Sequence, residues 1–209
     1  MMGARDVELD ILKEVGTIGG GNAATALSSL LKTPVQISVP SVQMVPFPEL
    51  LEAAGGEEKV AAVTFLRIAG HISGSIFFVL EPEEMQAVGR SLVQSWNLPY
   101  TPENEQELLE SAVCELTNIL AGSYLSALSD FTGLYMMPTV PSSAVDMIGA
   151  LLSEGLIEAG LEGDEAIMID TNMTKGENRS QMAGWFFMIP DAHSLPKIFS
   201  SLGVQEDGE

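Results

Sequence analysis

An internal repeat constrains this chain more than any other feature, because a sequence that occurs twice folds into two copies of one structural unit. Residues 10–28 (DILKEVGTIGGGNAATALS) align without gaps on residues 111–129 (SAVCELTNILAGSYLSALS), at an offset of 101. Most apolar positions keep their character, and the identical pairs are Glu14/Glu115, Ile18/Ile119, Gly21/Gly122, Ala26/Ala127, Leu27/Leu128 and Ser28/Ser129. We therefore expect two units, each beginning with this segment.

Both copies of the segment are predicted to be long amphipathic helices. Apolar residues recur at the spacing of one helical face, at Ile11, Val15 and Ile18 in the first copy and at Ala112, Leu116 and Ile119 in the second. Alternating or β-branched sequence follows each helix and predicts strands at 35–45, 60–66, 71–80, 135–140, 165–173 and 182–190. Arg67–Gly70 is expected to form a hairpin connection, and further helices are expected at 82–96 and 144–159.

Each half is thus a helix followed by about three strands, joined by the polar stretch 99–107. A unit of that size rarely forms a stable core alone. We therefore expect an α+β fold, a pseudo-two-fold duplication of a helix-plus-three-strand unit that shares one core. The whole chain, 1–209, should be a single domain, with internal repeats at approximately 8–96 and 108–203.

The composition excludes several classes of partner and chemistry. A formal net charge of −20 would repel a nucleic-acid backbone or an anionic membrane surface, so a macromolecular partner should offer a basic or neutral patch. No apolar stretch is long enough to cross a bilayer. One cysteine and an acidic amino terminus without a signal pattern predict a cytoplasmic protein. With two histidines and one cysteine, no metal site is expected.

The second repeat places a carboxylate and an amide on one helical face. Glu115, Asn118 and Gly122 follow one another at i, i+3 and i+7. A Glu-x-x-Asn pair by itself is common on solvated helices. However, Asn disfavours helix interiors and Gly costs about 1 kcal/mol there relative to Ala, so both residues occur at some energetic loss. Close helix packing is an alternative explanation for Gly21 and Gly122.

The stretch 19–24 (GGGNAA) also fits the G-x-G-x-x-A pattern of dinucleotide-binding proteins. That pattern requires a preceding strand and an acidic residue about 20 positions later. Here a helix precedes the stretch and the acid is missing, so close helix packing is the preferred interpretation.

The repeated pattern (Asp/Ser)-x-x-x-Glu-x-x-Asn-x-x-x-Gly resembles the signature of the CheC family of chemotaxis phosphatases (the CheC, CheX and FliY type). The second copy is complete at Ser111, Glu115, Asn118 and Gly122. The first copy, at Asp10, Glu14, Thr17 and Gly21, has threonine where the family usually has asparagine. The resemblance extends through GGGNAATAL, LAGSYLSALSDFTG and VDMIGALLSEGL, so it covers most of the chain.

The resemblance implies a protein phosphatase that hydrolyses the aspartyl-phosphate of the response regulator CheY. It assigns Asn118 to orient the attacking water, and Glu115 and Glu14 to hold a lysine of the docked regulator. The regulator's own carboxylates would hold Mg²⁺, so the phosphatase needs no cofactor. Thr17 would mark a degenerate site, because its shorter hydroxyl presents one donor where an amide presents two. If Thr17 turns inward and bonds a backbone carbonyl, the first site would not face solvent.

The resemblance also leaves a non-catalytic alternative, a CheD-binding or flagellar-switch interaction module. The segment 145–154 resembles the region of the family that contacts the receptor deamidase CheD, which makes Asp146 a candidate partner-binding residue. An ordinary core helix with Asp146 in its first turn explains the same segment equally well.

Overall fold

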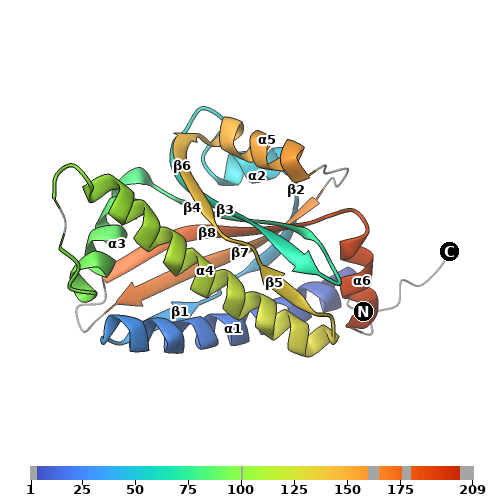
Figure 1. Cartoon of the computed structure of the whole chain (residues 1–209). Helices are drawn as coiled ribbons and strands as arrows, with labels where there is room; N and C mark the ends of the chain where they lie inside the picture. The colour runs from blue at the N-terminus through green and yellow to red at the C-terminus, as the bar shows by residue number, and fades with distance from the viewer. Residues whose placement is uncertain (1–3, 100, 160–164, 176–179, 203–209) are drawn as a thin grey trace.

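A computed structural model of the chain describes residues 4–99, 101–159, 165–175 and 180–202, and the side chains in these ranges except 4–6, 47–48, 154–159, 165, 175 and 180–183 (Figure 1). The first half consists of α1 (Ala4–Leu31), β1 (Val35–Ser38), β2 (Val42–Pro46), α2 (Phe47–Ala53), β3 (Val60–Gly70), β4 (Gly74–Leu80) and α3 (Pro82–Ser95). The second half repeats this order with α4 (Glu105–Thr132), β5 (Met136–Pro138), β6 (Ser142–Met147), α5 (Ile148–Ala159), β7 (Glu165–Lys175), β8 (Ser180–Pro190) and α6 (Ser194–Ser201).

The strands form one antiparallel sheet to which both halves contribute. Its order is β1-β7-β8-β4-β3-β5, with β2 also paired to β7 and β6 also paired to β3. The hairpins of the two halves meet where β4 pairs with β8, with Phe77 opposite Phe187. The two short strands of each half pair with the hairpin of the other half. Both halves thus contribute to one sheet and to the core on each of its faces.

Helices cover both faces of the sheet, and the alternation of side chains along the strands gives each face its own core. The long helices α1 and α4, together with α3 and α6, cover one face, to which Phe78 and Phe186 point. The short helices α2 and α5 lie on the other face, over Phe77 and Phe187 (Figure 1). The fold is therefore α+β, as predicted. Within the described ranges, no helix is both long and apolar enough to span a bilayer.

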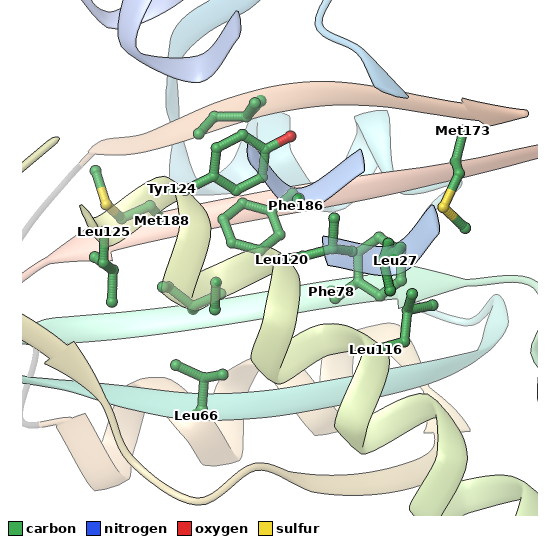
Figure 2. Close-up of a cluster of buried hydrophobic side chains, with 14 of the residues drawn as sticks. Leu27, Leu66, Phe78, Leu116, Leu120, Tyr124, Leu125, Met173, Phe186 and Met188 are labelled. Atoms are coloured by element: carbon green, nitrogen blue, oxygen red, sulfur yellow. The ribbon is translucent and has the colours of Figure 1, made fainter. Parts of the chain in front are cut away.

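The sheet-facing side of α4 is anchored by large side chains. Figure 2 shows Leu116, Leu120 and Tyr124 of this helix among Phe78 and Phe186 of the sheet. The ring centroids of Tyr124 and Phe186 lie 4.9 Å apart, and the Tyr124 hydroxyl lies 3.4 Å from the Thr171 Oγ1. Burial raises the pKa of the Tyr124 phenol, so it stays protonated. Another side of α4 carries the exposed residues Ser111, Glu115 and Ser126.

The predicted long helices and the helix at 82–96 are confirmed, the latter with Pro82 in its first turn. The predicted strand 35–45 is two strands, interrupted at 39–41. The predicted hairpin connection Arg67–Gly70 is wrong, because β3 continues through it and the turn lies at 71–73. Pairing with β5, with Ile68 opposite Pro138 and Gly70 opposite Met136, extends the strand. That partner is distant in sequence, so local patterns do not show it.

The helix predicted at 144–159 is wrong in its first turn. Residues 142–147 form strand β6, with Val145 opposite Ala62 and Asp146 opposite Ala61, and the helix begins at Ile148. Again a strand from the other half decides the structure. The short helices α2 and α6 were not predicted, because elements of 7 and 8 residues are too short to establish a helical period.

Candidate functional site

Each repeat presents its glutamate motif on the outer side of a long helix. On α4, the Glu115 side chain is exposed and the Asn118 side chain is half-buried, with Gly122 one turn further along. On α1, Glu14, Thr17 and Gly21 are all exposed. The structure thus brings the predicted residues of each motif together on one accessible helical face, as the spacing predicted.

The glycines of the two motifs do not serve close helix packing. A Cβ atom built at Gly21 or Gly122 meets no other atom within 4 Å. By contrast, a Cβ at Gly19 would lie 2.9 Å from the Tyr124 Cα, and one at Gly20 would lie 3.2 Å from the Ile37 Cγ2. Close helix packing is therefore confirmed for Gly19, which meets α4, whereas Gly20 packs closely against strand β1. For Gly21 and Gly122 the packing prediction is wrong.

The two motifs differ in the side chain three residues after the glutamate, which is Thr17 in the first motif and Asn118 in the second. The Thr17 hydroxyl donates a hydrogen bond of 2.8 Å to the backbone carbonyl of Lys13, one turn earlier. The side chain nevertheless remains exposed, so it does not turn into the core. Its only donor is occupied within the helix, whereas the amide of Asn118 in the second motif has two donors. The first motif is therefore the weaker of the two for binding a water through a donated hydrogen bond.

The cysteine next to the second motif is not activated as a nucleophile. Cys114 precedes Glu115, and its thiol is half-buried beside Ser143 and Glu110. Burial, followed by the charge of Glu110, raises the pKa of the thiol, although a hydrogen bond with Ser143 opposes this shift. The thiolate is thus disfavoured. Among the residues that the structure describes, no three His, Cys, Asp or Glu side chains are grouped to hold a metal ion.

An apolar cavity of about 20 Å³ lies beneath α1 and α4, lined by residues such as Val15, Tyr124 and Met188. A space of that size holds about one water molecule, and its apolar walls offer a water no partners. It cannot admit a substrate. Neither Glu115 nor Asn118 lines this cavity, so it is not part of the second motif.

The structure places Asp146 in strand β6 and not in the first turn of a helix, so the interpretation of this segment as a core helix with an early acid is wrong. The side chain is exposed, and its Oδ1 accepts a hydrogen bond of 2.7 Å from the backbone N–H of Met147. Its neighbours Val145 and Met147 are 43% and 45% exposed. Sequence reasoning missed this apolar strand edge, because it assigned both residues to the helix predicted at 144–159.

The fold and the two helical motifs define a class of protein, in which a duplicated α+β fold carries a glutamate motif on each long helix. Comparisons with known proteins identify the same class. The model of the CheC-like family matches residues 7–44 and 109–145, which contain both motifs. The CheY-P phosphatase CheC of Bacillus subtilis (strain 168) is 38% identical over 202 residues, which is 97% of each chain. The chain therefore belongs to the CheC-like family.

Two further relatives share the fold. The flagellar motor switch phosphatase FliY of Bacillus subtilis (strain 168) is 28% identical over 201 residues, which cover 96% of this chain and 44% of FliY. The crystal structure of Thermotoga maritima FliY superposes with a TM-score of 0.71 at 20% identity, covering 96% of this chain and 98% of that chain. At that identity the second similarity establishes the fold alone.

Proposed function

We propose that this chain is a phosphatase that hydrolyses the aspartyl-phosphate of phosphorylated CheY. The observation that carries the proposal is the complete Glu115 and Asn118 pair on the solvent face of a helix fixed in the core. The relative that is 38% identical along almost its whole length bears the name CheY-P phosphatase. A motif on the solvent face of a helix suits a substrate that is itself a folded protein.

In the proposed reaction, the phosphatase positions the attacking water and the regulator, and the regulator supplies the phosphoryl group, the lysine and the Mg²⁺. The Asn118 amide holds a water in line with the phosphorus–oxygen bond, and the Glu115 carboxylate pairs with a lysine of the regulator to fix the docking register. Attack of the water on phosphorus forms one phosphorus–oxygen bond and breaks the bond to the aspartyl oxygen. The products are the regulator's free carboxylate and inorganic phosphate. Mg²⁺ is held by the regulator's carboxylates and not by this chain.

In the first repeat, we propose that Glu14 docks a regulator without efficient hydrolysis. The carboxylate is as exposed as that of Glu115, whereas the Thr17 hydroxyl donates to the Lys13 carbonyl. A water near Thr17 could only donate to the hydroxyl oxygen, which orients it less firmly than an amide. The protein would then have one efficient site, on α4.

The test is the rate of phosphate release from phosphorylated CheY, in Mg²⁺ buffer, with and without this protein. Catalysis predicts that the rate above spontaneous hydrolysis rises in proportion to protein concentration and that each molecule turns over many times. If the protein leaves the spontaneous rate unchanged, it is an interaction module. The reaction is proposed to occur in the cytoplasm, in line with the single cysteine.

A second partner, CheD, is proposed for strand β6, and the exposed Asp146, Val145 and Met147 support this surface. Asp146→Lys should weaken CheD binding in a calorimetric titration and leave phosphate release at the parent rate, because β6 carries no part of the Glu115 and Asn118 pair. Glu83→Lys, the same charge change on the exposed side of α3, is the matched control. Equal CheD affinities for the parent and Asp146→Lys would remove Asp146 from the interface.

A further inference from the structure

Two helical glycines leave space that no atom of the described chain fills. A Cβ built at Gly21 or Gly122 meets nothing within 4 Å. Every other helical glycine whose surroundings the structure describes has a near neighbour, namely Val39 at Gly16, Tyr124 at Gly19, Ile37 at Gly20, Leu109 at Gly89 and Glu57 at Gly149. Tight packing therefore explains the glycines at 19, 20, 89 and 149, and Gly16 is in ordinary van der Waals contact, whereas packing does not explain Gly21 or Gly122.

The backbone gives no other reason for a glycine at position 122. It lies in the interior of α4, ten residues before the last helical residue, Thr132. The left-handed cap of this helix is Gly133, with a φ of 70°, and Gly122 has no positive φ. In a helix interior, alanine is more favourable than glycine, because glycine loses more conformational freedom on folding. Glycine at this position therefore makes the helix less stable than alanine would.

The empty space adjoins the group proposed to orient the water. Gly122 follows Asn118 by four residues, which places the two positions one turn apart on the same face of α4. In the proposed reaction, the regulator brings its phosphoryl group to a water on the Asn118 amide, so a loop of the regulator would lie over this turn. A methyl group at position 122 would hold that loop away from the helix.

We propose that Gly122 is a positioning residue, whose missing side chain lets the phosphorylated loop of the regulator pack against the α4 backbone. This inference rests on the proposed phosphatase function and adds a steric requirement to it. Gly21 leaves the same space on α1, beside Glu14 and Thr17, so the first repeat keeps the shape needed for docking even though it lacks the amide.

The test substitutes Gly122→Ala and Gly122→Leu and measures both the urea midpoint of unfolding and kcat for phosphate release from phosphorylated CheY. Alanine should raise the midpoint, because it favours the helix and meets no neighbour. At the same time kcat should fall on the order of 10- to 100-fold, since a displacement of about 1 Å can cost about 10²-fold. Leucine should lower kcat further. Ser126→Ala, at an exposed position one turn beyond, should keep the parent kcat.

A parent kcat in Gly122→Ala would overturn the inference, and so would a lower urea midpoint, which would mean that the glycine serves the fold. Failure here is distinguishable from failure of the proposed function. If the parent hydrolyses phosphorylated CheY, Asn118→Ala does not, and Gly122→Ala does, then only the steric role of Gly122 is wrong. If the parent itself gives no release above the spontaneous rate, both proposals fall.

Discussion

At the scale of single residues, the second motif combines an exposed carboxylate with a cysteine that is kept unreactive. The Cys114 thiol is half-buried, and its burial raises the pKa of the thiol above the ordinary value. A raised pKa leaves the thiol protonated through neutral pH, and the nucleophilic thiolate forms only at higher pH than for a free cysteine. Its position next to Glu115 therefore gives no reason to assign it a covalent step.

This state of Cys114 predicts slow alkylation. At pH 8, iodoacetamide should modify the folded protein several-fold more slowly than the protein unfolded in urea, where the thiol regains its ordinary pKa. The rate in the folded protein should continue to rise with pH beyond the point at which the unfolded protein levels off. Mass spectrometry of quenched samples measures both rates. Equal rates in the folded and unfolded protein would show that burial does not protect this thiol.

At the scale of elements, α1 and α4 carry two versions of one glutamate motif, and three residues after the glutamate the first has Thr17 where the second has Asn118. Thr17→Asn should supply the missing amide at an exposed position. In the parent background the rate per molecule should rise by up to about twofold if the two sites act independently. The decisive background is Asn118→Ala, in which the second site is silent.

Phosphate release that Thr17→Asn restores in the Asn118→Ala background would show a latent first site on α1. Circular dichroism of the double variant serves as the control for folding. An intact fold without any recovery would mean that α1 lacks more than the amide. Lys13 is then the next difference to test, since its backbone carbonyl accepts a hydrogen bond from the Thr17 hydroxyl and its equivalent in the second repeat is Cys114.

The helices and strands also show which parts of the fold and of the site could be predicted from the sequence alone. The faces of α1 and α4 followed from the spacing of Ile11, Val15 and Leu116, and the placement of the glutamate motifs followed from those faces. The strand β6 could not be predicted from local sequence, because Val145 becomes a strand residue only through its pairing with Ala62 of the other half. The open space at Gly122 was also hidden, since a repeat shows that two positions correspond but not what surrounds them.

At the scale of the whole molecule, the exchange of strands between the halves makes each half depend on the other. Strands β1 and β2 are completed by β7, and β5 and β6 are completed by β3. A half expressed alone would leave its hairpin with an unpaired edge and the apolar face of its long helix without a partner. We therefore propose that the chain is a single domain, as the small size of each half predicted.

A fragment of residues 1–98 should therefore show no cooperative thermal transition at concentrations where sedimentation shows a monomer. Mixing it with a fragment of residues 99–209 should restore helix content and a single transition, since the two fragments supply each other's missing strands. A cooperative transition of the monomeric first fragment would show instead that the halves are independent domains.

The most direct measurement of the phosphatase account is the rate of phosphate release from phosphorylated CheY by Asn118→Ala. The substitution removes the proposed water-binding amide from an accessible position and leaves a residue that helices favour, so the fold should remain intact. We predict a fall of about 10²-fold relative to the parent, with Thr17→Ala, the matched change on α1, close to the parent rate. Release by Asn118→Ala at the parent rate would contradict the account.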